Sequence, residues 1–231
     1  ARGTRICNSS AQGVAIAEYV MAQVLSVVHP VQQQRDLQAA RQWKVTPFRE
    51  LSQMNWLIAG FGPIGQEVAK RVKAFGATTS VIRRTPAASP LADKVGTMAD
   101  LPAFLPAADV IVLACSLNDA TRGLADAGFF AAVQEGAILV NIARGALVDQ
   151  DALRVALDDG RVALASLDTV EPEPLPEGHW LYAHPQVHLS AHISWSSPER
   201  HDRILGIFLE ELARWEADEP LVNVVDRDAG Y

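Results

Sequence analysis

Apolar stretches of strand length alternate along this chain with segments whose apolar residues recur every three or four positions. The strand-length stretches are residues 56–59, 78–82, 109–115, 137–142, 162–167 and 187–190. The helical pattern covers residues 14–28, 31–43, 67–75, 100–105, 124–133, 149–158 and 198–217. Apolar strands that alternate with helices are typical of a parallel sheet covered on both faces. We therefore expect an α/β fold built on a doubly wound parallel sheet.

A glycine turn joins the first strand to its helix. Gly60, Gly62 and Gly65 follow the apolar stretch with the spacing G-x-G-x-x-G. Gly60 would permit a sharp turn, Gly62 would let a pyrophosphate approach the backbone, and Gly65 would let the helix pack close to the strand. The amides and the positive dipole end of that helix would face the phosphates, and Pro63 suits its first turn. The motif predicts a Rossmann-type dinucleotide site, whereas the glycines alone would fit a plain turn.

The position that selects the cofactor holds two arginines. NAD-binding domains usually carry an acidic residue about 20 residues after the glycines, where it binds the ribose hydroxyls. This chain has Arg83, Arg84 and Thr85 there. Two guanidinium groups would bind a 2′-phosphate that a carboxylate would repel. We therefore expect NADP, with NAD possible; the simpler interpretation is a solvated arginine pair.

Polar residues follow the strands at the edge where ligands of such sheets bind. They are Arg83, Ser116, Arg144, Asp168 and His192. Arg144 follows a buried strand, and its guanidinium group could bind a carboxylate through two hydrogen bonds, although a structural salt bridge is the alternative. His192 could exchange a proton near neutral pH. Taken alone, His192 would more often be structural, and Glu173 in its proline-rich segment would be exposed.

The composition and net charge of the chain disfavour several classes of function. The chain has 231 residues, 49% of them apolar, and a net charge of −7, which disfavours disorder and nucleic acid as the main partner. No apolar stretch reaches membrane-spanning length, so we expect no membrane partner. The two cysteines, Cys7 and Cys115, suggest neither a disulfide framework nor a metal cluster. A reducing cytoplasm fits this composition best.

Several motifs together resemble the D-isomer-specific 2-hydroxyacid dehydrogenases over nearly the whole chain. They are the glycine turn, residues 141–149, residues 167–174, and His192 with Ile193. The separations of 29 residues from Arg144 to Glu173 and of 19 from Glu173 to His192 are similar to that family's Arg–Glu–His set. Two departures concern substrate preference. Ala191 stands where the family commonly has Pro, and residues 169–170 are Thr-Val instead of Val-Phe.

The resemblance implies hydride transfer between NADP(H) and a 2-oxo acid or D-2-hydroxy acid, with glyoxylate and hydroxypyruvate as the first substrates to consider. Arg144 would bind the substrate carboxylate, His192 would protonate the alkoxide, and Glu173 would hydrogen-bond His192. The implied cofactor-binding residues are Gly60, Gly62, Pro63, Ile64, Gly65, Arg83, Arg84, Thr85, Ser116, Ile142, Ala143, Arg144, Asp168, His192 and Ser194. Among them, Asp168, Ile142 and Ala143 would hold the nicotinamide end. No metal is expected.

The resemblance also implies a domain organisation. Residues 10–197 would form the dinucleotide-binding domain, while residues 1–9 and 198–231 would be remnants of a substrate domain whose larger part is absent. The apolar helix from Val14 and the arm after Pro30 would form a homodimer contact. Such a chain is expected to bind NADP(H) but to turn over 2-oxo acids slowly.

Two other functions share this fold. A nucleotide-sensing corepressor keeps similar motifs, although the acidic balance argues against it. Formate oxidation is associated with Gln at the position of Glu173, which disfavours that reaction here.

Overall fold

The computed structural model describes residues 4–225, which fold around one parallel sheet. The strands lie in the order β3-β2-β1-β4-β5-β6-β7, and every neighbouring pair is parallel. Their bounds are β1 (Asn55–Ala59), β2 (Thr78–Ile82), β3 (Lys94–Gly96), β4 (Val110–Leu113), β5 (Ala137–Asn141), β6 (Val162–Leu167) and β7 (Val187–Leu189). The predicted doubly wound parallel sheet is confirmed. Its strand order reverses between β1 and β4, where such sheets bind their ligands.

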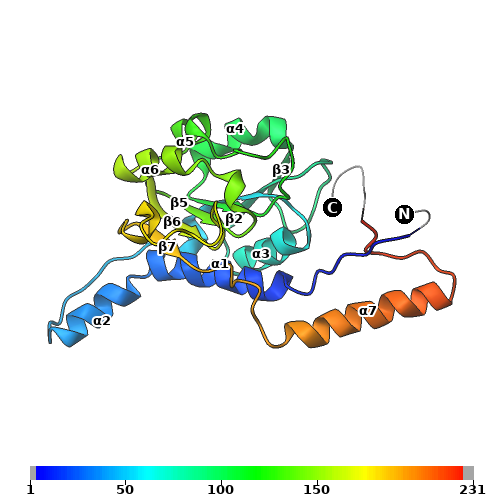
Figure 1. Cartoon of the computed structure of the whole chain (residues 1–231). Helices are drawn as coiled ribbons and strands as arrows, with labels where there is room; N and C mark the ends of the chain where they lie inside the picture. Colours follow the sequence, from blue (N-terminus) through cyan, green and yellow to red (C-terminus); the bar gives the residue numbers. More distant parts are fainter. Residues whose placement is uncertain (1–3, 226–231) are drawn as a thin grey trace.

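Helices cover both faces of the sheet (Figure 1). On one face α1 (Gly13–Val28) packs against α3 (Pro63–Ala74). The remaining helices are α2 (Val31–Ala39), α4 (Leu101–Phe104), α5 (Ala127–Ala132), α6 (Gln150–Asp158) and α7 (Arg200–Glu216). Short 3-10 turns lie at Leu51–Gln53, Met98–Asp100, Leu105–Ala107, Gly145–Leu147 and Trp180–Tyr182. In Figure 1, α2 and α7 project from this body, and neither helix buries a residue.

The apolar core has two halves, one on each face of the sheet. Side chains alternate along β1, so Leu57 packs with α5 and α6 while Trp56 and Ile58 pack with α1 and α3. Because both faces are covered, all the residues of β4 and β5 are buried. This is why these strands read as unbroken apolar stretches in the sequence.

Several predicted elements differ from the structure, and three of the differences have a clear physical reason. The strand β3 was not predicted, because a three-residue edge strand with an exposed Lys94 gives no apolar stretch. The helix expected over residues 31–43 ends at Ala39, since Arg41 takes a positive φ of 54° that ends helical geometry. The helix expected from residue 124 begins at Ala127, where the Asp126 carboxylate accepts from the Phe129 amide at 2.8 Å and caps it.

The described segments near the two ends of the chain pair with each other. Cys7 and Val224 form an antiparallel bridge, and the Asn8 amide donates to the Asn223 carbonyl at 2.8 Å. The guanidinium of Arg5 lies 4.8 Å from the ring of Trp215 on α7. Residues 4–8 and the segment from α7 to residue 225 therefore form one unit beside the sheet body (Figure 1). The expected domain boundaries stay a prediction, and residues 1–3 and 226–231 lie outside the described residues.

None of the described helices is, by itself, long and apolar enough to cross a membrane, and only the bent pair of α1 and α2 passes that test jointly. Within residues 4–225, no group of three or more His, Cys, Asp or Glu side chains is arranged to hold a metal ion.

Candidate active site

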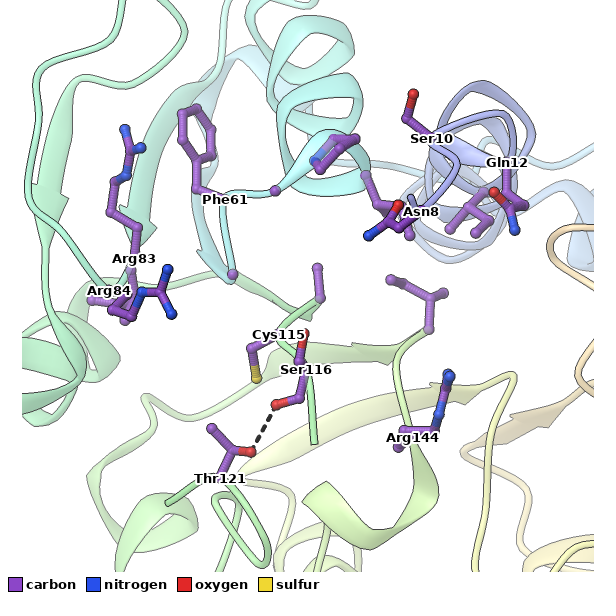
Figure 2. Close-up of a pocket in the computed structure, with 18 of the residues that line it drawn as sticks. Asn8, Ser10, Gln12, Phe61, Arg83, Arg84, Cys115, Ser116, Thr121 and Arg144 are labelled. Atoms are coloured by element: carbon purple, nitrogen blue, oxygen red, sulfur yellow. Dashed lines mark hydrogen bonds between the residues drawn. The ribbon is translucent and has the colours of Figure 1, made fainter. Parts of the chain in front are cut away.

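A cavity of about 730 Å³ opens at the carboxyl ends of the strands (Figure 2). The glycine turn after β1, the loops after β2, β4, β5 and β7, and the residues before α1 form its walls. The predicted site residues that line it are Gly60, Gly62, Pro63, Ile64, Arg83, Arg84, Thr85, Ser116, Ile142, Arg144, His192 and Ser194. Four predicted residues, Gly65, Ala143, Asp168 and Glu173, are not among the residues that line it.

The glycine turn is built for close backbone approach. Gly60 has a φ of 109°, and a Cβ there would lie 2.5 Å from the Ala114 carbonyl carbon. A Cβ at Gly65 would lie 2.1 Å from the Gly60 carbonyl oxygen, so this position also requires glycine. Gly62 has no atom within 4 Å of its Cβ position and faces the cavity. The turn therefore leaves open space in front of the α3 N-terminus.

The N-terminus of α3 fits a pyrophosphate. Pro63 occupies the first turn, and no side chain caps this helix end. The first amides of a helix have no intrahelical partner, and they lie at the positive end of its dipole. With the gap at Gly62, this observation supports a dinucleotide at the cavity wall.

The two arginines after β2 lie on one side of the cavity (Figure 2). Arg83 is half-buried, its guanidinium lies 5.7 Å from the ring of Phe61, and its Nη1 donates to the Ala87 carbonyl at 3.4 Å. Arg84 is exposed and also lines the cavity. Both side chains therefore bring positive charge to this side of the cavity, where it would attract a phosphate.

The loop after β4 forms another part of the cavity wall. Thr121 is buried, and its hydroxyl donates to the Ser116 carbonyl at 2.7 Å (Figure 2). The Asn118 amide donates back to the Thr121 hydroxyl at 2.9 Å, so the loop is cross-linked. Burial raises the pKa of the Cys115 thiol to about 11, and this thiol remains protonated at neutral pH. The residues of this loop that line the cavity are therefore uncharged at neutral pH.

Arg144 stands on a turn held by Asn141. The buried Asn141 amide donates to the Arg144 carbonyl at 2.9 Å and accepts from the Ala143 amide at 3.1 Å. The side chain of Arg144 is exposed, and its Nη1 donates to the Ala143 carbonyl at 2.6 Å. The next residue, Gly145, packs on the backbone of Val170, which fixes the turn against the loop that carries Glu173.

His192 and Glu173 form the pair that the resemblance implied. Nδ1 of His192 lies 3.0 Å from a Glu173 oxygen, and the other Glu173 oxygen accepts from the Val170 amide at 3.1 Å. Both side chains are more than a third exposed. Because the carboxylate accepts from Nδ1–H, the second ring nitrogen of His192 is the one left to exchange a proton.

Asp168 lies beneath the His192 loop. It is buried, and its carboxylate accepts from the Ile193 amide at 2.8 Å and the Ser194 amide at 3.1 Å. Its carbonyl accepts from the His192 amide at 2.9 Å. The structure thus gives Asp168 a part in fixing this loop, while its contact with a nicotinamide stays a prediction.

Sequence reasoning missed part of the cavity wall. The unpredicted lining residues include Asn8, Ser9, Ser10, Gln12, Phe61, Asn118, Thr121 and Trp195. Phe61 could have been found, because it lies inside the glycine motif itself. The short polar stretch before α1 carries no motif, and only the fold brings it to the cavity.

Comparison with known proteins identifies relatives of the chain. Residues 21–194 match the family model described as D-isomer specific 2-hydroxyacid dehydrogenase, NAD binding domain. A human glyoxylate reductase/hydroxypyruvate reductase is 41% identical over 130 residues, which cover 56% of this chain and 40% of that protein. A Bacillus subtilis D-3-phosphoglycerate dehydrogenase is 31% identical over 94% of this chain and 41% of its own length. The chain therefore spans about two fifths of these two curated relatives.

Solved structures give the same picture. A D-isomer specific 2-hydroxyacid dehydrogenase from Xanthobacter autotrophicus Py2, in complex with NADPH and MES, has a TM-score of 0.88 at 29% identity, over 99% of this chain and 95% of that one. An NADPH-dependent glyoxylate/hydroxypyruvate reductase from Sinorhizobium meliloti, in complex with NADP and sulfate, has a TM-score of 0.87 at 26% identity. That match covers 99% of this chain and 74% of the other.

Proposed function

This chain belongs to the D-isomer specific 2-hydroxyacid dehydrogenase family, and on that premise we propose that it transfers a hydride between NADP(H) and a 2-oxo acid or D-2-hydroxy acid. One observation carries the proposal. His192, hydrogen-bonded to Glu173, lines the same cavity as Arg144 and the glycine turn. A group that exchanges protons, a group that binds carboxylates and a site for phosphates therefore share one cavity.

The cofactor would lie along the α3 N-terminus, with its adenosine phosphate at Arg83 and Arg84. The nicotinamide ring supplies or accepts the hydride when it is bound, and the protein orients the substrate and moves the proton. NADP is favoured because two relatives in the comparisons were solved with NADPH or NADP, and because two guanidinium groups lie where NAD-binding domains usually carry an acid.

Each of the three polar side chains has its own task. Arg144 would bind the carboxylate of the 2-oxo acid and polarise its carbonyl. His192 would give its proton to the oxygen of that carbonyl during reduction and take it back during oxidation. Glu173 would hold the ring of His192 in the orientation and tautomer that this transfer needs.

Glyoxylate or hydroxypyruvate is the proposed substrate, since relatives carry these reductase names. The relatives found in the comparisons are named as reductases and dehydrogenases, which favours the enzyme over a corepressor-like module.

The rest of the proposal concerns organisation. We infer that residues 10–197 form the cofactor domain, that residues 1–9 and 198–231 belong to the substrate domain, and that the protein is cytoplasmic. A homodimer would use the arm after α2, where Trp43, Val45 and Phe48 expose apolar side chains. The helix α1 was expected to bury its apolar side partly against a second copy. It buries Ile16, Val20 and other residues within its own chain, so the arm is the better candidate contact.

The test combines cofactor binding with turnover. The purified chain, at high concentration, is titrated with NADPH and NADH and then given glyoxylate, hydroxypyruvate and pyruvate in turn. We expect NADPH oxidation with at least one 2-oxo acid and its loss in His192→Ala, which should still bind NADPH. Oxidation that proceeds unchanged in His192→Ala, or none with any 2-oxo acid, would contradict the proposal.

A further inference from the structure

We propose that Tyr19 is a positioning residue for His192, acting through Ser190 and Asp168. Tyr19 lies on α1, 171 residues before Ser190, yet its hydroxyl oxygen is 2.7 Å from the Ser190 hydroxyl oxygen. Ser190 in turn donates to the Asp168 carboxylate at 2.5 Å. The inference rests on the proposed function for the importance of His192, while the contacts themselves are independent of it.

The direction of these hydrogen bonds follows from the number of protons. A serine hydroxyl has one hydrogen, and Ser190 uses it on Asp168, which as a carboxylate only accepts. Tyr19 must therefore donate its own hydrogen to Ser190. The second hydroxyl near Tyr19, that of Ser166, lies at 3.5 Å, which is too long for a strong hydroxyl bond. The two hydrogen bonds therefore run in one direction, from Tyr19 to Ser190 and from Ser190 to Asp168.

This series of hydrogen bonds ends at the loop that carries His192. Ser190 stands two residues before His192, and the Asp168 carboxylate accepts from both amides that follow it, those of Ile193 and Ser194. His192 itself has a positive φ of 53°, a conformation that non-glycine residues seldom adopt. Such a backbone persists only where its surroundings hold it. The loop is held on both sides of the strained residue by one carboxylate.

Tyr19 adds a third element to this support. Asp168 follows β6 and Ser190 follows β7, so without Tyr19 the loop would be anchored to neighbouring strands only. The Tyr19 hydroxyl connects it to α1, which is itself packed against α3, the helix of the glycine turn. The orientation of the proton-exchanging side chain is thereby tied to the element that would hold the phosphates.

The test compares Tyr19→Phe, Ser190→Ala and the double variant in the full chain. Ser26→Ala is the matched control, because the Ser26 hydroxyl also lies on α1 but donates to the Gln23 carbonyl of its own helix. The first readout is the nitrogen NMR spectrum of the His192 ring, which reports the tautomer of the neutral ring without any need for turnover. We expect the Nδ1–H form to dominate in the unmutated chain and to lose its dominance in both single variants.

The second readout is kinetic. Loss of one positioning hydrogen bond should lower kcat by about tenfold. The Kd for NADPH should stay within about twofold, because the phosphate contacts are untouched. If Tyr19 acts through Ser190, the double variant should be no worse than Ser190→Ala, and Ser190→Thr, which keeps a hydroxyl, should restore most of the activity.

Three outcomes would overturn the proposal: an unchanged His192 spectrum in Tyr19→Phe, additive losses in the double variant, or an equal loss in Ser26→Ala. Should Tyr19→Phe fail to fold, an unchanged His192 spectrum in Ser190→Ala would overturn the proposal, because Tyr19 is proposed to act through Ser190. An unmutated chain without turnover would count against the proposed function, while the NMR comparison would still decide on Tyr19.

Discussion

Gly145 and Val170 lie so close that no side chain fits between them: a Cβ added at Gly145 would be 2.0 Å from the carbonyl carbon of Val170. The contact joins two turns with different tasks. One turn carries Arg144, and the other leads within three residues to Glu173, whose oxygen accepts from the Val170 amide. The distance between Arg144, the proposed carboxylate-binding residue, and the His192–Glu173 pair therefore depends on a glycine.

We expect Gly145→Ala to force these turns apart. Overpacking against backbone should cost about 1–3 kcal/mol of unfolding free energy and lower Tm by roughly 5 °C. A displacement near 1 Å between reacting groups should lower kcat/KM by about a hundredfold. Thermal melts and steady-state assays measure both. Gly178→Ala is the control, because nothing lies within 4 Å of its Cβ position; equal effects of the two changes would contradict this explanation.

A methyl group at Gly62 should weaken cofactor binding without harming the fold. No atom lies within 4 Å of that Cβ position, and the backbone is extended, with φ of −75° and ψ of −169°. The unfolding free energy should therefore change by less than about 0.5 kcal/mol. The added methyl enters the space proposed for the pyrophosphate, so the Kd for NADPH should rise by about tenfold or more. Fluorescence titration that shows unchanged affinity would place the phosphates elsewhere.

Replacing Arg83 and Arg84 together with Ala should abolish the preference for NADPH over NADH. Charge-assisted hydrogen bonds contribute about 1.5–3 kcal/mol each, and exposure reduces this value, so we expect the Kd for NADPH to rise by about tenfold to a hundredfold. The Kd for NADH should stay within about twofold, since NADH lacks the 2′-phosphate. Lys70→Ala, which removes an exposed cation from α3, is the matched control. Equal affinities for the two cofactors in the unmutated chain would contradict the assignment.

Substitution of Glu173 should lower kcat far more than substitution of Glu171. Glu173 contacts the His192 ring at 3.0 Å, whereas Glu171 faces Arg122 at 3.7 Å. Glu173→Gln should lower kcat by about a hundredfold, in the range of a lost contribution to acid–base catalysis. Glu171→Gln should change kcat by less than about twofold, because this exposed ion pair is weak. The two variants differ by two positions in one loop, so a similar loss in both would show that only the loop matters.

The raised pKa of the Cys115 thiol predicts that the unfolding free energy depends on pH. Burial raises its pKa from 9.0 to about 11. A thiol whose pKa is higher in the folded state stabilises the fold fully below about pH 9, and this contribution disappears as the pH rises through 11. Urea unfolding of the Cys115→Ser variant should therefore lose less stability between about pH 9 and pH 11 than the unmutated chain. With Cys7→Ser as background, the reaction of Cys115 with a disulfide reagent should still be accelerating at pH 10, and NADPH should slow it.

The sequence predicted those features that depend on neighbouring residues. The glycine turn, the apolar strands β4 and β5 and the polar residues after them are local patterns, and the structure reproduces them. The His192–Glu173 pair came from spacing within a resemblance, and its 3.0 Å contact agrees with it. The edge strand β3 escaped because only three residues pair there.

What escaped prediction depends on long-range contacts. No local pattern places Asn8 or Gln12 at the cavity, because these residues precede α1 and meet the loops after the strands only in the folded chain. The bond between Tyr19 and Ser190 joins residues 171 positions apart, and tyrosine on an apolar helix reads as core. Asp168 was recognised as a site residue, but its contacts with the amides of Ile193 and Ser194 could not be predicted, because almost any residue type can supply a backbone amide.

The pairing of Cys7 with Val224 joins the two segments in which the chain leaves the sheet body. The chain leaves that body between residues 8 and 12, and again between Ser194 and α7. Because the two departing segments are hydrogen-bonded to each other, a displacement of one would carry the other with it. Both connecting segments also line the cavity, the first through Asn8 and Gln12 and the second through Ser194 and Trp195. Any displacement of the unit formed by residues 4–8 and the segment from α7 to residue 225 would therefore change the cavity wall at both places.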